Sequence, residues 1–185
     1  MTITKRRLQR EARREQLLRV AISCYGELGV ERAGHGDIAK RAKVSTATVF
    51  NYFATREKLT EAVFQEVYNV FDKMFSTITP PGFTPQEHVQ KLADSYVFLA
   101  QQHPDILKVV LNWSASFGQG VRPQFLKFQE WVLKGIEHHM HKENPDPSDA
   151  TMILTASYSY ARMKLDNTPE AVLDNYVARV IQAVS

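Results

Sequence analysis

The sequence predicts an all-α protein with about nine helices, in which a three-helix, helix-turn-helix head precedes a larger helical body. Three observations lead to this fold class. Apolar residues recur at helical spacing along most of the chain. Helix-capping residues and prolines stand ahead of these stretches. Segments that alternate apolar and polar residues, as half-buried strands do, are scarce.

The first third of the chain predicts three helices. An apolar stripe at helical spacing predicts a helix over residues 10–28, and Gly29 is expected to end it. A short helix is expected at 36–42. Ser45 is the predicted N-cap of a third helix that continues to about residue 52.

The remaining helices are marked by caps and prolines. Thr55 is a predicted cap, and the Thr84-Pro85, Asp146-Pro147 and Thr168-Pro169 pairs place a capping residue before a proline at the first helical position. We expect two units, a head over residues 1–54 and a body over residues 55–185. The helices expected in the body are 55–78, 85–101, 104–117, 121–142, 147–165 and 168–183.

Composition limits the classes of protein to consider. The chain has 185 residues and 44% hydrophobic content, enough for a sizeable core. We find no apolar run of membrane-spanning length and no signal peptide at the N-terminus. The one cysteine, Cys24, cannot form an intrachain disulfide. These features favour a soluble protein of the bacterial cytoplasm with no membrane contact.

Charge is divided unevenly along the chain. Residues 1–60 carry 13 Lys and Arg against 6 Asp and Glu, whereas residues 61–185 carry 10 against 14. A basic first third on an acidic body suggests that the first third meets a polyanion. A solvated basic helix face would give the same charge pattern.

The helices at 36–42 and 45–52 predict a helix-turn-helix whose second helix enters the DNA major groove. Small and hydroxylated residues in its first turn would allow close approach to phosphates, and the amide of Asn51 could pair with a base edge, adenine being the usual match. Val49, Phe50 and Phe53 are expected to point inward. The residues expected to bind DNA are Arg6, Arg7, Arg10, His35, Ser45, Thr46, Ala47, Thr48, Asn51, Tyr52, Thr55 and Lys58.

Two of these groups have other interpretations. Arg6, Arg7 and Arg10 lie ahead of or at the start of the first expected helix, where an unstructured basic arm could enter the minor groove or simply be solvated. His35 could meet a phosphate or cap the second helix, and capping is the favoured role. Thr55 and Lys58 could hold a phosphate at the start of the next helix.

Residues 17–59 resemble the N-terminal domain of the TetR family of regulators. The resemblance is carried by Ile38-Ala39, Lys43-Val44-Ser45, Phe50-Asn51-Tyr52-Phe53 and Arg56-Glu57-Lys58-Leu59. The stretches 34–39 and 47–57, with Asn112-Trp113-Ser114-Ala115-Ser116 in the body, look like the LuxR/HapR/SmcR branch of quorum-sensing regulators. Lys43 stands where the family commonly has glycine, which implies a turn without positive φ or a strained one. The basic segment before the first helix is short for that branch.

The resemblance implies a homodimer whose two heads lie roughly 34–36 Å apart on a near-palindromic site. In the family the last two helices form a four-helix interface with the partner. An ordinary core would show the same apolar stripe. The residues expected at the interface are Ile153, Ala156, Tyr160, Val172, Tyr176 and Val180.

Aromatic residues with interspersed polar ones mark the middle helices and suggest a pocket for a small apolar ligand. A packed aromatic core is an equally good interpretation. The residues expected to line the pocket are Phe75, Tyr96, Asn112, Trp113, Ser116, Gln129, Leu133 and Tyr158.

Enzymatic motifs are missing from the sequence, and we expect no catalytic residue, cofactor or metal. The His138 to His141 run lacks the spacing of a zinc site and is better explained as a solvated helix end. We therefore expect a DNA-binding regulator, with a ligand-responsive repressor as the alternative and a helical enzyme or scaffold as a distant third hypothesis.

Overall fold

The computed structural model describes residues 2–78, 85–140 and 146–184. Within these ranges the chain folds into nine helices and no strand, which confirms the expected fold class. The helices are α1 (Thr2–Leu28), α2 (His35–Ala42), α3 (Thr46–Tyr52), α4 (Arg56–Ser76), α5 (Pro85–Gln102), α6 (Pro104–Ser114), α7 (Arg122–Met140), α8 (Pro147–Leu165) and α9 (Glu170–Val184).

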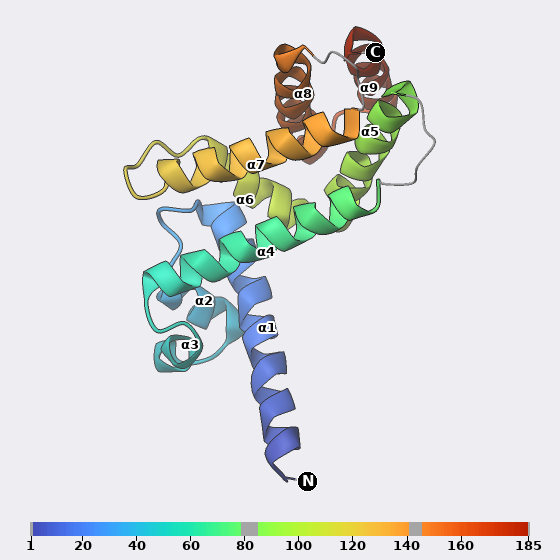
Figure 1. Ribbon diagram of the computed structural model, residues 1–185. Coiled ribbons are helices and arrows are strands. Elements are labelled where there is room, and N and C mark those ends of the chain that lie inside the picture. Colours follow the sequence, from blue (N-terminus) through green and yellow to red (C-terminus); the bar gives the residue numbers. More distant parts are fainter. Residues whose placement is uncertain (1, 79–84, 141–145, 185) are drawn as a thin grey trace.

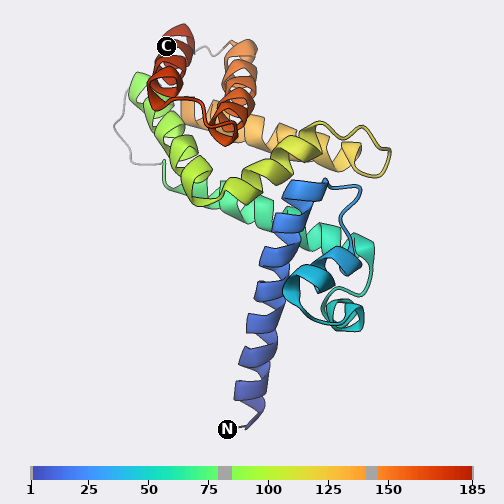
Figure 2. The same cartoon turned by 180° about the vertical axis from the view of Figure 1, so that it is seen from behind.

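The helices form two groups that α1 joins. We call α1–α3 the head and α4–α9 the body. In both views α2 and α3 lie beside the middle of α1, and the N-terminal part of α1 projects beyond them (Figures 1 and 2). The last two helices, α8 and α9, lie at the opposite end of the molecule.

Three of the expected caps are present. The Ser45 hydroxyl accepts a hydrogen bond from the Thr48 amide at 3.1 Å, and Thr55 does the same for Lys58 at 3.2 Å. Asp146 caps α8 by accepting from the amide of Ser148 at 2.8 Å. Each cap satisfies one of the amides that a helix start leaves unpaired. The expected cap at Thr84 lies outside the described residues.

The first helix is longer than expected. We expected an unstructured arm before residue 10, but α1 is helical from Thr2. Residues 5–16 contain neither glycine nor proline and consist largely of strong helix formers. Arg7 and Glu11 also form an i,i+4 ion pair at 3.2 Å. Nothing in this stretch interrupts a helix, so the basic residues lie on its surface.

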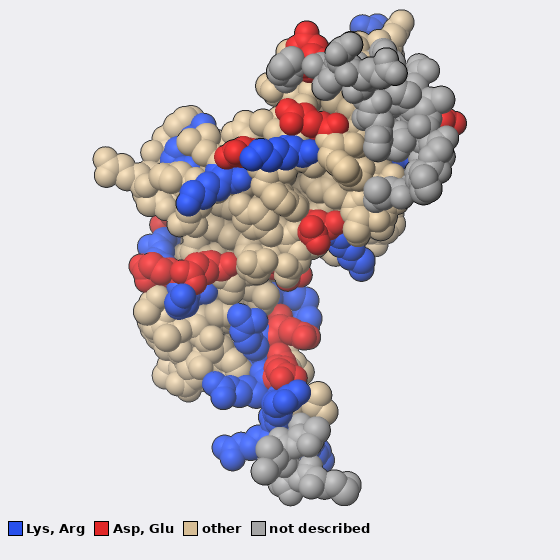
Figure 3. Space-filling view, viewed as in Figure 1, with Lys and Arg blue, Asp and Glu red and all other residues tan. Residues whose placement is uncertain are grey.

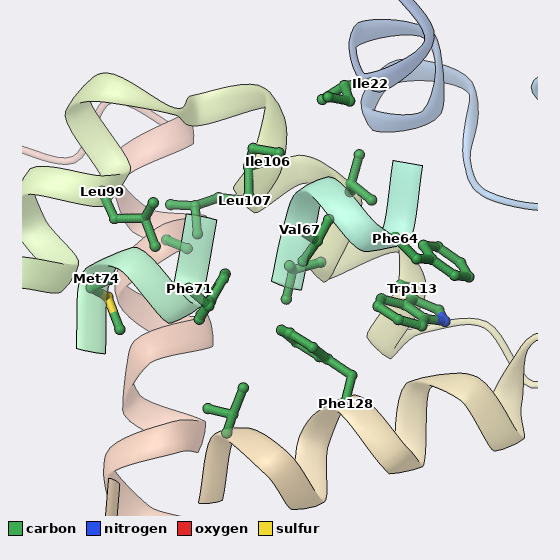
Figure 4. Packing of buried hydrophobic residues seen from close by; sticks show 14 of the residues in the cluster. Ile22, Phe64, Val67, Phe71, Met74, Leu99, Ile106, Leu107, Trp113 and Phe128 are labelled. Carbon is green, nitrogen blue, oxygen red and sulfur yellow. The ribbon is translucent and has the colours of Figure 1, made fainter. Parts of the chain in front are cut away.

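The core of the body is aromatic. The ring of Phe64 on α4 stacks on Trp113 of α6 with centroids 3.7 Å apart, and the ring of Phe128 on α7 also stacks on Trp113, with centroids 5.2 Å apart. Figure 4 shows these three rings together with Phe71, which meets Phe128 edge to face. The cluster holds α4, α6 and α7 together.

The end of α1 is built into the body. Gly26 lies against α6, and the Asn112 amide of α6 donates a hydrogen bond to the Gly26 carbonyl at 2.7 Å. The Tyr25 hydroxyl lies 2.8 Å from that of Thr60 on α4. Because α1 contacts both α2 and α6, its position couples the head to the body.

Candidate DNA-binding site

The turn between α2 and α3 is closed by backbone hydrogen bonds. Lys43 adopts a left-handed conformation (φ 55°, ψ 45°), and the Val44 amide donates to the Ala39 carbonyl at 3.0 Å. Lysine is strained in this conformation, where glycine is not. Of the two possibilities that the sequence left open, the strained turn is therefore the one present.

The outer face of α3 is available to a ligand. Thr46, Ala47 and Asn51 are exposed, whereas Val49 is fully buried and anchors the helix. The role of Ser45 is structural, because its hydroxyl accepts a hydrogen bond from the Thr48 amide and shares a 2.8 Å hydrogen bond with the Thr48 hydroxyl. It positions the first turn of α3.

His35 lies inside the head, so the predicted phosphate contact does not fit its position. Its ring is 7% exposed, and Nε2 donates a 2.6 Å hydrogen bond to the Phe53 carbonyl. The favoured capping role is also wrong, because Asp37 accepts from the Gly34 amide at the start of α2. The imidazole instead fixes the end of α3 to the start of α2.

Phe50 departs from its expected position. Its ring stacks on His35 with centroids 3.9 Å apart, yet 46% of the residue is exposed, so it covers the histidine rather than pointing into the core. Phe53 is buried as expected, and the Arg14 guanidinium lies 5.3 Å from its ring centroid. The stacked rings of His35 and Phe50 and the buried ring of Phe53 therefore help to hold α3 in place.

A basic groove lies between α1 and α3. It encloses about 1180 Å³, and its α3 wall carries Thr48, Asn51 and Tyr52. Lys and Arg side chains gather along the lower part of α1 in Figure 3. The α1 wall of the groove consists of Arg6, Arg7, Gln9, Arg10, Ala12, Arg13 and Gln16.

Four residues that line the groove were not in the predicted DNA-binding set, namely Gln9, Ala12, Arg13 and Gln16. Gln9, Arg13 and Gln16 continue the face of Arg6 along α1 at helical spacing. The signal was the periodicity itself, which is meaningful only once α1 is known to be helical from Thr2. On a continuous helix these side chains form a row along one face. The row includes four arginines, Arg6, Arg7, Arg10 and Arg13, which face α3 across the groove.

The start of α4 carries the remaining predicted contacts. Thr55 is exposed and caps the helix, so its hydroxyl is partly used. The Lys58 ammonium forms a 2.7 Å ion pair with Glu61, and both side chains are well exposed. Such surface pairs contribute little to stability, about 0–1 kcal/mol, so a phosphate could displace the glutamate.

The body contains an apolar cavity, but only part of the predicted set lines it. Phe75, Tyr96 and Tyr158 do. The predictions for Asn112, Trp113, Ser116, Gln129 and Leu133 were wrong, since none of them lines this cavity.

The polar groups of α6 have structural partners instead. Asn112 bonds to Gly26, and the Ser116 hydroxyl donates to the Asn112 carbonyl at 2.9 Å. Trp113 is fully buried, and its indole Nε1 donates to the Val121 carbonyl at 3.3 Å. Gln129 and Leu133 are half-buried on α7.

Most residues expected at the dimer interface are used within the single chain. Ile153 and Tyr160 are buried, and both line the cavity. Ala156, Tyr176 and Val180 also line it. Val172 is 49% exposed, and Ala156, Tyr176 and Val180 are half-buried, so these four keep surface that a partner chain can contact.

Among residues 2–78, 85–140 and 146–184, no group of three or more His, Cys, Asp and Glu is arranged to hold a metal ion. No helix in this part of the chain is long and apolar enough to cross a membrane.

A helix-turn-helix with an exposed second helix and an arginine-lined groove is typical of DNA-binding proteins of the helix-turn-helix class. Residues 17–63 match the family model described as bacterial regulatory proteins, tetR family. The HTH-type transcriptional regulator LuxR of Vibrio harveyi is 31% identical, with 91% of this chain and 90% of that protein covered. The chain therefore belongs to the TetR family and is a DNA-binding transcriptional regulator.

The chain is also similar to one further regulator in sequence and to two solved structures in fold. The HTH-type transcriptional regulator BetI 1 of Chromohalobacter salexigens is 26% identical over 73% of this chain and 68% of that protein. A TetR-like regulator from Rhodococcus sp. RHA1 has the same fold, with a TM-score of 0.75 at 17% identity over 91% of each chain. The regulator FadR from Bacillus subtilis, solved in complex with stearoyl-CoA, has a TM-score of 0.65 at 16% identity and covers 92% of this chain and 99% of its own.

Proposed function

We propose that the protein acts as a homodimer on a near-palindromic operator, with α3 in the major groove and the α1 arginines on the phosphates beside it. The observation that carries this proposal is the groove in which Arg6, Arg7, Arg10 and Arg13 face Thr48 and Asn51 across one open space. A DNA strand in that space would meet cations on one side and hydrogen-bonding side chains on the other.

The contacts divide into two kinds. Asn51 is exposed on α3, and its amide can pair with a base edge, so it would read sequence. The arginines of α1 and Lys58 at the start of α4 carry charge without a base-specific geometry and would bind phosphates. Thr46 and Ala47 are small enough to bring α3 close to the duplex.

Residues 1–54 would serve as the DNA-binding unit and residues 55–185 as the dimerisation and regulatory unit. The likeness to LuxR of Vibrio harveyi supports a role in quorum sensing, exerted on DNA in the bacterial cytoplasm. Two heads on one dimer would contact half-sites roughly 34–36 Å apart.

The test begins with selection of the operator from random DNA by the purified protein. Fluorescence anisotropy then compares Asn51→Ala, Lys58→Ala and a control, Gln101→Ala on the exposed surface of α5, outside the head and outside the two helices expected at the dimer interface. Asn51→Ala should lose about 5- to 150-fold discrimination at one base pair, since a bidentate contact contributes roughly 1–3 kcal/mol. Lys58→Ala should weaken operator and random DNA alike, and the control should change neither.

Salt dependence separates the two kinds of contact. Arg10→Ala should reduce the slope of log affinity against log salt by about 1, whereas Asn51→Ala should leave the slope unchanged. Equal losses on operator and random DNA for Asn51→Ala would rule out its base-reading role.

A ligand-responsive repressor is a second candidate, favoured by the apolar cavity of the body. Its walls come from α4, α5, α7, α8 and α9, and α4 also begins beside the head at Thr55. A ligand that prefers one position of α4 would favour one position of the head, and DNA affinity would change by that difference in binding free energy.

A further inference from the structure

The cavity of the body is lined by side chains from five helices. Its volume is about 60 Å³, and 21 residues line it. Phe71 and Met74 of α4 and Phe128 of α7 form part of its wall, and their packing is visible in Figure 4. A water molecule needs roughly 10–15 Å³ of cavity volume on this measure, so the space has room for several and suits a small ligand or a ligand's head group.

Charge is missing from the lining. None of the 21 lining residues is Lys, Arg, His, Asp or Glu. A carboxylate or ammonium entering this space would lose its water without gaining a counter-charge, which is strongly unfavourable. The wall therefore selects uncharged molecules.

The polar atoms of the lining are few, and two of them are already used. The Ser157 hydroxyl donates to the Ile153 carbonyl at 2.9 Å, and the Tyr176 hydroxyl donates to the Ala156 carbonyl at 3.3 Å. In the described part of the chain, the buried hydroxyls of Tyr96 on α5 and Tyr158 on α8 have no hydrogen-bond partner. A buried hydroxyl without a partner is unfavourable, so these two are the groups that a ligand would satisfy.

Both tyrosines remain donors at neutral pH. Burial, with a smaller effect of the nearby Tyr158 and Tyr160, raises the pKa of Tyr96, whose ring lies 6.3 Å from that of Tyr160. Burial raises the pKa of Tyr158 to about 12. Neutral phenols offer an O–H to an acceptor, and a carbonyl oxygen has two lone pairs to accept it.

We propose that this cavity binds a small uncharged molecule with a carbonyl or similar acceptor oxygen, held by hydrogen bonds from Tyr96 and Tyr158. The proposal rests on the ligand-responsive function above and specifies the chemistry of its effector. In this proposal the apolar part of the molecule packs against Phe71, Val89 and Phe128 of the lining, and its oxygen accepts the hydrogen bonds of the two tyrosines.

The test measures binding of cyclic ketones, from cyclobutanone to cyclohexanone, to the full chain by ligand-observed NMR. Each ketone is paired with the methylenecycloalkane that has the same shape but carries CH₂ in place of the oxygen. The ketone should bind several-fold more tightly than its hydrocarbon partner. The matching cycloalkane carboxylate should not compete.

Three variants assign the effect to side chains. Tyr96→Phe and Tyr158→Phe should each weaken ketone binding about two- to tenfold, the effect of one hydrogen bond, and leave the hydrocarbon unchanged. Tyr176→Phe is the matched control, since its hydroxyl lines the same cavity but is bound to Ala156. Thermal unfolding checks that all three variants fold.

The proposal is overturned if no ketone binds in the millimolar range, if ketone and hydrocarbon bind equally, or if either Tyr96→Phe or Tyr158→Phe binds the ketone like the unchanged protein. Operator binding by the same variants is measured in parallel. If a variant fails to bind DNA even without ketone, that result counts against the proposed DNA-binding mode and not against the cavity, because ligand binding is measured without DNA.

Discussion

Gly26 of α1 packs closely against α6, and replacing it with alanine tests whether this contact fixes the head on the body. A Cβ at residue 26 would lie 3.0 Å from the Lys108 Cβ and 3.2 Å from the Asp105 carbonyl oxygen. Both atoms are fixed to the backbone of α6, so the steric clash is relieved only if the two helices separate. Separation would also lengthen the 2.7 Å hydrogen bond from Asn112 to the Gly26 carbonyl.

Two opposing effects set the magnitude. Overpacking of this kind lowers the free energy of unfolding by about 1–3 kcal/mol. Alanine within a helix stabilises it by about 0.5–1 kcal/mol relative to glycine. The net expectation for Gly26→Ala is a loss of about 0.5–2 kcal/mol, or a fall in Tm of roughly 1–8 °C for a chain of this size.

Thermal unfolding followed by circular dichroism measures the change. Gly36→Ala is the matched control, because residue 36 lies in α2 with nothing within 4 Å of its added Cβ. That control should gain stability from the helix effect alone. If Gly26→Ala is as stable as Gly36→Ala, the fit of α1 against α6 is loose and does not hold the head in place.

Two further predictions concern the turn between α2 and α3 and the ion pair between α1 and α2. Lys43→Gly should raise the free energy of unfolding by about 0.5–1 kcal/mol in thermal unfolding, because relief of left-handed strain, about 1–2 kcal/mol, exceeds the entropic cost of glycine, about 0.5–1 kcal/mol. Lys43→Ala keeps the strain, and a gain equal to that of glycine would contradict the assignment. The second prediction concerns pH. The hydrogen bond from Arg41 to Glu27, at 2.6 Å, lowers the pKa of Glu27 below its ordinary value of 4.5. The pair therefore contributes stability above that value and loses it as pH falls through the lowered pKa. Glu27→Gln should lose less stability than the unchanged protein in urea titrations between about pH 6 and about pH 3, whereas Glu11→Gln, whose ion pair lies within α1, should behave like the unchanged protein.

The head could be predicted largely from its sequence because its organising contacts are local. Ser45 and Thr55 cap helices whose amides lie three residues ahead, and Val49 is buried one turn after the cap. The role of His35 could not be predicted in this way. It depends on Phe53, 18 residues further along the chain, whose carbonyl approaches only after α2 and α3 have packed together.

The body shows the same limit more strongly. Periodicity predicts its helices but cannot distinguish an aromatic side chain that fills the core from one that borders a space. Trp113 is sandwiched between Phe64 and Phe128, while Tyr96 reaches the cavity with an unpaired hydroxyl. Asn112 has the polar character of a pocket residue, yet its partner is a backbone carbonyl 86 residues away.

The two faces of α8 explain why two of the predicted dimer residues, Ile153 and Tyr160, are buried within the protomer. Ile153, Leu154 and Tyr160 point into the body, so they are unavailable to a partner chain. The stripe looked like one interface because a helix packed inside a protomer and a helix packed across a dimer both need apolar residues at the same spacing. Exposure separates the two cases: Met152 is 39% exposed on α8 and Val172 is 49% exposed on α9. A dimer built on these two helices would use the exposed faces that carry Met152 and Val172, together with the half-buried Ala156, Tyr176 and Val180.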